Sequence, residues 1–198
     1  MTKLRRYGLL VPLAALSLAG CGINSVPTAE EAVNAEFGNL QAEYQRRADL
    51  IENLVEVVKA GAASEEEILT QVTEARARAT STQLSPEQLD DPAAVQAFTQ
   101  AQAELTQARS LLGTVIVEKY PEIRSQDLYT QLLDQIEGTE NSILVGRRDY
   151  NAAVQRYNTT IRTFPDAIGA KIIHGAEPKI PFEAAAGAED APSVDFDS

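Results

Sequence analysis

Few residues in this chain could do chemistry. Its only cysteine is Cys21, near the N-terminus, and its only histidine is His174, close to the C-terminus. A lone thiol cannot form an intramolecular disulfide, and one cysteine with one histidine is too small a set for a zinc site. Glu137 and Glu140 have the i, i+3 spacing of a di-iron bundle, but such a site also needs histidines on the same helices. We therefore interpret this carboxylate pair as a solvated helix face and His174 as a surface or tail-packing residue.

The sequence also contains no motif for nucleophilic catalysis or for phosphate binding. No serine has a recognisable base or a strained strand-to-helix turn around it. No glycine-rich phosphate-binding loop occurs in the sequence. We therefore predict no catalytic residues, no metal and no cofactor, and we do not expect an enzyme.

The position of Cys21 explains its presence better than catalysis does. Three basic residues lie near the start of the chain, a mostly apolar run fills residues 7–19, and LAGC at 18–21 looks like a bacterial lipobox. In a lipobox the thiol is lipidated, with acyl chains such as palmitate, and the chain is cut just before the cysteine. We therefore predict a lipoprotein signal peptide at residues 1–20 and a short tether at 21–27. An ordinary secretory signal or a retained anchor is the alternative, but a bilayer span needs roughly 20 apolar residues.

The residues around this segment suggest where the body of the protein resides. Gly22 follows the cysteine where an aspartate would indicate retention in the inner membrane. In a cell with two membranes, we therefore expect the periplasmic face of the outer membrane. The net charge is −12, and loss of the three basic leader residues would take it to −15. Such acidity disfavours nucleic acid and anionic lipid headgroups, so membrane attachment should depend on the lipid.

Apolar residues recur at steps of three and four along most of the chain, which is typical of amphipathic helices. Thr28 with Glu31 and Ser64 with Glu67 have the spacing of capping boxes. Asp91 before a proline marks a third helix start. The predicted helices span about residues 28–60, 64–79, 91–119 and 125–163, and SPEQL in the second loop could form a single turn.

Four amphipathic helices joined by short or moderate loops predict an all-α fold. The expected architecture is an antiparallel four-helix bundle with long helices and coiled-coil-like packing over residues 28–174. Residues 175–198 are acidic and rich in Ala, Gly and Pro, which predicts a mostly irregular tail.

Two long blocks of sequence carry a family resemblance. The first is RRADLIENLVEVVKAGAASEEEIL at 46–69, followed by TEARA at 73–77, and the second runs from EKYPEIRS at 118–125 to YNTTIRTFP at 157–165. Both resemble the LemA family of bacterial membrane-associated proteins. Matching positions are Arg47, Asp49, Leu50, Ile51, Asn53, Leu54, Val55, Lys59, Ala75, Arg76, Tyr120, Pro121, Glu140, Asn141, Arg147, Tyr150, Asn151, Tyr157, Asn158, Phe164 and Pro165. The resemblance implies a long-helix bundle, but it supplies neither an established molecular function nor catalytic residues.

The chain departs from the family pattern at a few places. Glu52 stands where many members have proline, and Ala176 stands where many have an aromatic residue after glycine. Loss of that aromatic predicts weak docking of the tail, although Ile180, Phe182, Val194 and Phe196 could still dock parts of it. Many relatives are held by an uncleaved N-terminal helix, whereas this chain is expected to use a lipid.

Several polar residues fall on or beside the apolar stripes of the long helices. On a helical wheel Arg47 lies within the stripe of the first helix, so we predict that it is buried and paired with a carboxylate, Glu140 first. On the last long helix, the polar positions beside the apolar seam are Glu140, Arg147, Asn151 and Asn158. We interpret them as structural residues that fix the alignment of the bundle; a polar ligand or partner groove is the alternative.

Asp49 and Asn53 lie away from the stripe, so they are candidates for a second helix contact or for a surface that binds a partner. The sequence thus predicts a lipid-anchored envelope protein that acts as a non-catalytic interaction or scaffold module, with another envelope protein as its partner. The alternative is a ligand-binding or accessory subunit of an envelope enzyme system.

Overall fold

The structure of the protein is a computed structural model that describes residues 21–62, 65–124 and 127–183. Its elements, in chain order, are α3 (Cys21–Ala62), α4 (Glu66–Ser81), the 3₁₀ turn η1 (Pro86–Gln88), α5 (Pro92–Lys119), α6 (Pro121–Arg124), α7 (Asp127–Thr160), α8 (Asp166–Gly169) and the π-helical turn η2 (Ala170–His174). All regular structure within these described ranges is helical, which confirms the predicted all-α fold.

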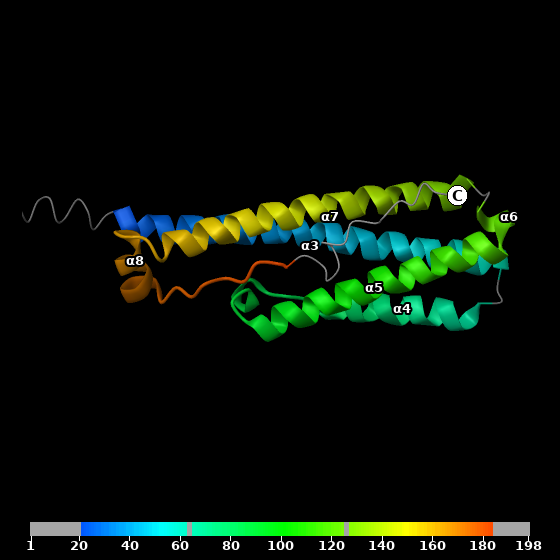
Figure 1. Cartoon of the computed structure of the whole chain (residues 1–198), viewed down its shortest axis with the longest axis horizontal. Coiled ribbons are helices and arrows are strands. Elements are labelled where there is room, and N and C mark those ends of the chain that lie inside the picture. Colours follow the sequence, from blue (N-terminus) through cyan, green and yellow to red (C-terminus); the bar gives the residue numbers. More distant parts are fainter. Residues whose placement is uncertain (1–20, 63–64, 125–126, 184–198) are drawn as a thin grey trace, which may run out of the picture.

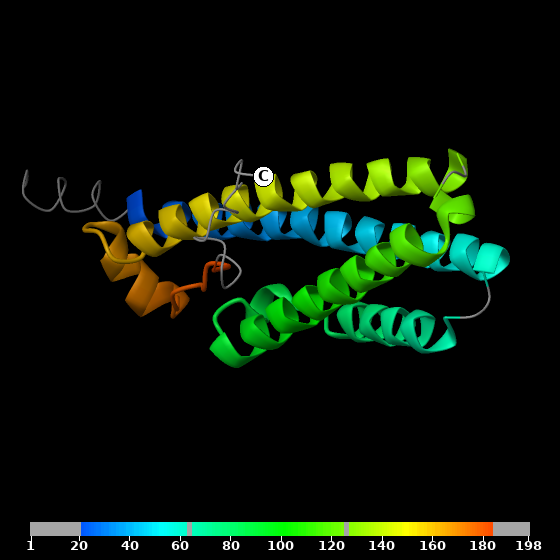
Figure 2. The same ribbon diagram turned by 45° about the vertical axis from the view of Figure 1, so that its right-hand side comes forward.

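The two longest helices, α3 and α7, lie side by side and antiparallel (Figure 1). At about 1.5 Å per residue, their 42 and 34 residues span about 63 and 51 Å. α4 and α5 form a second antiparallel pair in which α4 also packs on α3, and α5 runs obliquely to α3 and α7 (Figure 2). The predicted antiparallel bundle of four main helices is therefore confirmed.

Local sequence signals set most of the helix boundaries. Asp91 caps α5, because its Oδ1 accepts a hydrogen bond from the backbone N–H of Ala93 at 2.9 Å. SPEQL forms the predicted turn, with a capping box between Ser85 and Gln88. α7 ends at Thr160, slightly before the predicted end, and the chain then turns into α8.

The start of the first helix was predicted wrongly. α3 begins at Cys21, so residues 21–27 are helical rather than an irregular tether. Thr28 does not cap the helix, because its Oγ1 donates a hydrogen bond to the carbonyl of Asn24 at 2.6 Å. Such a bond to the carbonyl four residues earlier is the one that threonine makes inside a helix.

Packing stabilises the helix before residue 28. Val26 is buried in the core, and Ser25 Oγ donates a hydrogen bond to Asp166 Oδ1 in α8 at 2.9 Å. Pro27 lies inside the helix, where a proline removes one backbone hydrogen bond. Burial of an apolar side chain and a tertiary hydrogen bond therefore outweigh the local signal for a helix start at residue 28.

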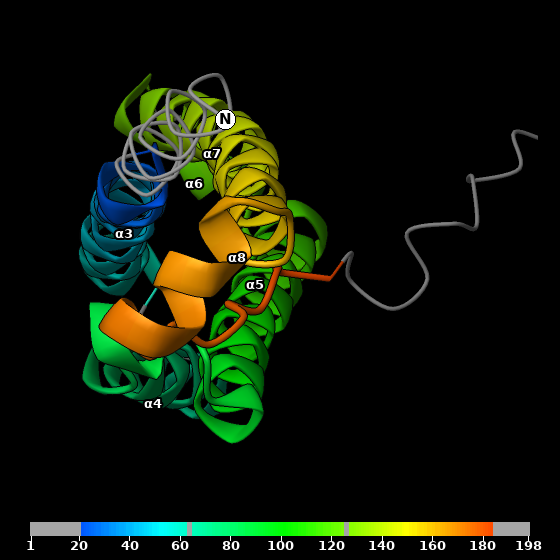
Figure 3. The ribbon, with the colours of Figure 1, turned by 90° about the vertical axis from the view of Figure 1, so that its left-hand side faces the viewer.

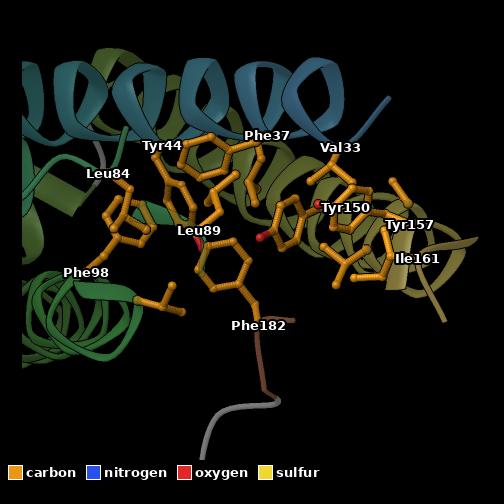
Figure 4. Close-up of a cluster of buried hydrophobic side chains, with 14 of the residues drawn as sticks. Val33, Phe37, Tyr44, Leu84, Leu89, Phe98, Tyr150, Tyr157, Ile161 and Phe182 are labelled. Carbon is orange, nitrogen blue, oxygen red and sulfur yellow. The ribbon is translucent and has the colours of Figure 1, made fainter. Parts of the chain in front are cut away.

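The apolar core consists of two clusters along the bundle. The cluster at the end where α3 begins is rich in aromatic residues, among them Phe37, Tyr44, Phe98, Tyr150, Tyr157 and Phe182 (Figure 4). The cluster toward α6 is mostly aliphatic and includes Leu54, Leu105, Leu112, Ile116 and Ile136. Polar side chains around Arg47 lie between the two clusters.

The C-terminal segment docks on the bundle up to the end of the described residues. Gly175 takes a φ of 56°, a left-handed conformation that suits glycine, where the chain leaves η2. Phe182 is 3% exposed, and its ring centroid lies 4.9 Å from that of Tyr150. The doubt about docking that came from Ala176 is therefore not supported, whereas the expected docking through Ile180 and Phe182 is confirmed, because Phe182 brings its own aromatic ring into the core.

Some predicted features lie outside the described residues. They are the signal peptide at 1–20, the Ser64 cap, the start of the last long helix at Ser125 or Gln126, and Val194 and Phe196 in the tail.

Candidate functional site

Arg47 is the centre of a buried polar layer between the two apolar clusters. Its side chain is 3% exposed, and its Nη1 lies 3.2 Å from Glu140 Oε2 on α7. Nη1 also donates to Thr106 Oγ1 at 3.0 Å, and Nη2 donates to Gln102 Oε1 at 2.6 Å, both on α5. The predicted burial of Arg47 and its pairing with Glu140 are therefore confirmed.

Gln102 extends this layer to the fourth helix. Its Nε2 donates a hydrogen bond to the carbonyl of Ala79 on α4 at 3.1 Å. Side chains of α3, α5 and α7 and a backbone group of α4 therefore meet at one level. Gln102 was not predicted, although it lies four residues after Phe98 and three before Leu105, within the apolar stripe of α5.

An open groove of about 280 Å³ adjoins the layer between α3, α4 and α5. Tyr44 lines it, and the Arg47 guanidinium lies 5.2 Å from the centroid of the Tyr44 ring. Burial raises the pKa of Tyr44 above its ordinary value, so its phenol is neutral at physiological pH. Gln41, Gln45 and Gln83 add further amide groups to the lining. The groove therefore offers neutral hydrogen-bonding groups to whatever enters it.

Asn151 and Asn158 bind the backbone of the docked tail. Asn158 Nδ2 donates to the carbonyl of Lys179 at 2.8 Å, and its Oδ1 accepts from the N–H of Lys179 at 2.9 Å. Asn151 makes the same pair of hydrogen bonds with Phe182, both at 2.8 Å. Each amide thus satisfies one backbone donor and one backbone acceptor. The side-chain amides of these asparagines therefore hold the tail against α7. They do not use these hydrogen bonds to join α7 to another helix of the bundle.

The spacing of the two asparagines matches the spacing of the tail residues that they bind. Asn151 and Asn158 are seven residues apart on α7, which corresponds to about 10.5 Å along a helix. Lys179 and Phe182 are three residues apart, or about 9–10 Å in an extended chain. Because the distance between the two asparagines agrees with the distance between the two tail residues, α7 can bind the extended tail at both residues without bending it.

Further contacts complete the attachment of the tail. Arg147 donates a hydrogen bond from Nη2 to the carbonyl of Glu183, and its guanidinium lies 6.0 Å from the centroid of the Phe182 ring. The Tyr150 hydroxyl donates to the carbonyl of Ile180 at 3.0 Å. Three of the four polar residues predicted beside the seam of α7 therefore bind the tail, and only Glu140 faces Arg47. These partners could not be predicted from the sequence, because the backbone groups of a segment leave no pattern of side-chain types.

Asp49 and Asn53 are both exposed on α3. Asp49 Oδ1 lies 3.9 Å from Arg76 Nη2 on α4, and Arg76 also pairs with Glu52. Asp49 thus makes the second helix contact that its position suggested. A role for either residue in binding a partner stays a prediction.

The remaining residues that could take part in catalysis or metal binding lie apart from one another. Glu137 is exposed, as a solvated helix face requires, whereas Glu140 points into the polar layer. His174 is exposed in η2. In the part of the chain that the structure describes, no group of three or more His, Cys, Asp or Glu side chains could hold a metal ion. The backbone of Cys21 opens α3, but its side chain is outside the description, so lipidation stays a prediction.

Two buried tyrosines show how strongly the first apolar cluster is shielded from water. Burial raises the pKa of Tyr157 to about 12, and it also raises the pKa of Tyr150.

None of the helices in the described ranges is both long and apolar enough to cross a bilayer.

Comparison with known proteins gives relatives among magnetosome proteins. The magnetosome proteins MamQ 1 and MamQ 2 of Paramagnetospirillum magneticum are each 27% identical to this chain over 160 residues. MamQ of Magnetospirillum gryphiswaldense is 27% identical over 158 residues. Each match covers 72% of this chain and 58% of the relative, so the chain spans less than two thirds of the length of these proteins.

A model of the LemA family matches residues 36–196. The match includes the Arg47–Glu140 pair of the polar layer and both asparagines that bind the tail. It extends beyond the long helices through the docked segment. Because it covers most of the sequence, the chain belongs to the LemA family.

Proposed function

We propose that this protein is a lipid-anchored component of the cell envelope that works as a non-catalytic scaffold and binds another envelope protein along its helical flank. Membership of the LemA family supports association with a membrane. The lipobox-like LAGC at 18–21 supports attachment through Cys21. Attachment would raise the local concentration of scaffold and partner on the same membrane.

The observation that carries the proposal is the Arg47 layer. Arg47 and Gln102 bring groups from all four main helices into one hydrogen-bonded network in the middle of the bundle. Such a network ties the α4–α5 pair to the α3–α7 pair, so that the relative positions of their outer faces are fixed. A rod of about 60 Å with fixed faces is suited to hold a binding surface at a distance from a membrane.

The surface that we assign to the partner is the flank where α3 meets α4. Asp49 and Glu52 have side chains that are 57% and 55% exposed, and both pair with Arg76 on α4. Asn53 lies exposed beside them. Ion pairs at such exposed positions contribute about 0–1 kcal/mol, so their side chains can be recruited by a partner at little cost to the fold.

Crosslinking in mild detergent tests the proposal. The native protein should be crosslinked to a specific envelope protein, and Asp49→Lys with Asn53→Lys should lose that protein while the helical circular dichroism is unchanged. A matched control is Gln131→Lys with Asp134→Lys on exposed positions of α7, because it makes the same change of charge on another face. Equal loss of the partner in both variants would contradict the assignment of the flank.

A second experiment separates attachment from recognition. Cys21→Ser should abolish the acyl adduct detected by mass spectrometry of the membrane fraction. The purified variant should still bind the partner in solution but fail to find it in cells. Recovery of an intact peptide that spans Gly20 to Asn24 from most of the native protein would contradict lipidation.

The groove beside Tyr44 supports a second candidate, a ligand-binding or accessory subunit of an envelope enzyme. Ala42→Trp would fill the groove from an exposed position of α3. If this candidate is correct, that change should abolish the function in cells while crosslinking of the partner is unchanged. Full function of the Ala42→Trp variant in cells would exclude the ligand-binding or accessory role.

A further inference from the structure

Large apolar side chains are exposed at the end of the bundle where α8 and η2 lie. Phe164, Ile168, Ile172 and Ile173 have exposed fractions of 68%, 55%, 78% and 58%. We refer to these four residues as the apical patch. Ile168 and Ile172 are four residues apart in consecutive helical turns, so they point to about the same side. Exposed apolar clusters of this kind mark surfaces that bind other molecules or membranes.

The apical patch lies at the end of the molecule where α3 begins. Figure 1 shows α8 beside the first turns of α3, and Figure 3 shows it lying across this end of the bundle. The hydrogen bond from Ser25 to Asp166 joins the two elements, and Ala170 of η2 is buried in the same cluster as Val26 of α3. The patch is therefore held in a fixed position relative to the first helix.

The sequence next to the start of α3 indicates that a membrane lies at this end of the bundle. Residue 20 is one peptide bond from the start of α3, and residues 7–19 are the most apolar run of the sequence. A lipid on Cys21 and a retained apolar leader would both place a bilayer at this end. An apolar surface beside the point of attachment therefore has a lipid surface within reach.

The charges around the patch fit the same partner. Arg162 and Lys171 are both exposed, one just before the patch and one within it. Long basic side chains next to an apolar surface can lie along it and place their charged ends among lipid headgroups. Asp166, the acid of α8, accepts the hydrogen bond from Ser25. Between residues 162 and 174 the exposed side chains with ionisable groups are therefore of basic types, although the chain as a whole is acidic.

We propose that the apical patch inserts into the boundary between lipid headgroups and acyl chains, next to the N-terminal attachment. An interfacial helix buries its apolar face about 5–10 Å into this region. Acyl chains on Cys21 would attach the protein at one point only, so a second contact with the bilayer adds to the attachment and limits rotation about that point. The contact also sets the long axis of the bundle upright, with the α6 end about 50 Å from the bilayer. The inference rests on the membrane attachment proposed above but not on the protein partner.

Fluorescence quenching tests this inference on the full processed chain in phosphatidylcholine vesicles. Ile172→Cys carries an environment-sensitive dye at the patch, and Leu144→Cys carries the same dye on α7. Leu144 is a matched control, because it is an apolar side chain with an exposed fraction of 64%, away from the patch. The chain without an introduced cysteine is the labelling control, because the sulfur of a lipidated Cys21 does not react with the dye.

We expect brominated acyl chains to quench most of the emission from position 172 and little of that from position 144. Ile172→Asp with Ile173→Asp should abolish quenching of a dye at position 168, while circular dichroism shows the same helix content. Equal quenching at positions 172 and 144 would overturn the inference. So would a blue-shifted emission at 172 that bromine does not quench, because a second copy of the chain would then cover the patch. No protein partner is present, so failure here is distinct from failure of the scaffold proposal.

Discussion

Replacement of Arg47 by methionine should destabilise the bundle strongly. Arg47→Met keeps a long, flexible apolar side chain in the stripe of α3 but removes the guanidinium that joins α3, α5 and α7. Gln102 Oε1 would lose a hydrogen bond of 2.6 Å and Glu140 would lose its counter-ion. Both groups lie in or beside the core, so the lost bonds are not fully replaced by water.

The structure allows an estimate of the cost. Removal of one member of a buried ion pair typically costs about 3–5 kcal/mol. Because Glu140 has 29% of its side chain exposed and can be rehydrated in part, we expect about 3 kcal/mol, the lower end of that range. With a urea dependence of roughly 2 kcal/mol per molar, the unfolding midpoint should fall by about 1.5 M.

Equilibrium unfolding in urea, followed by circular dichroism, measures this shift on the chain produced from Gly22 onward. Arg78→Met is the matched control, because Arg78 is 55% exposed and its pair with Glu104 is at the surface. Its expected cost is about 0–1 kcal/mol. Glu140→Gln keeps one acceptor but leaves the buried Arg47 guanidinium without a counter-ion, so it should also cost about 3 kcal/mol. The double variant with Arg47→Met should cost less than the sum of the two.

Two outcomes would refute the reasoning. An unchanged or higher midpoint for Arg47→Met would mean that apolar packing replaces the polar layer without loss, which occurs for some buried ion pairs. Strict additivity with Glu140→Gln would mean that the two side chains do not interact energetically, in spite of their 3.2 Å separation.

The other predictions concern the docked tail and its aromatic cluster. Phe182→Ala should cost about 3–5 kcal/mol in urea unfolding, because it leaves a cavity among aromatic rings. Asn158→Ala removes two hydrogen bonds worth about 1 kcal/mol each, so tryptic cleavage after Lys179 should become about 30 times faster, and Thr159→Ala should leave it unchanged. Burial holds the pKa of Tyr157 at about 12, against about 10 in the unfolded chain, so the folded state keeps a proton that the unfolded state loses. Stability should thus be complete below about pH 10 and decline toward pH 12, which a series of urea midpoints checks.

Sequence periodicity was sufficient for the helices and for the central ion pair. Arg47 lies within a regular apolar stripe of α3, and Glu140 lies beside the seam of α7, so a helical wheel placed them correctly. The same reasoning would have found Gln102, which occupies a stripe position of α5 between Phe98 and Leu105. Within long regular helices, the spacing of residues determines which side chains face one another.

Contacts that involve irregular backbone could not be predicted in this way. Asn151 and Asn158 bind main-chain groups of residues 179 and 182, and main-chain groups are the same in every sequence. The start of α3 was missed for a related reason. Thr28 carries a local capping signal, but burial of Val26 favours a helix that includes the residues before Thr28, and burial is a property of the folded state.

The Arg47–Glu140 pair also determines how α3 and α7 align along their length. Seams of apolar residues repeat about every seven positions in such helices, so one helix could slide past the other by seven residues and still match apolar to apolar. A slide of α7 in one direction would bring Arg147 opposite Arg47, and two guanidinium groups would repel each other. A slide in the other direction would bring Leu133 there and leave a buried charge without a counter-ion. One ion pair thus selects a single alignment among several that the apolar residues alone would tolerate.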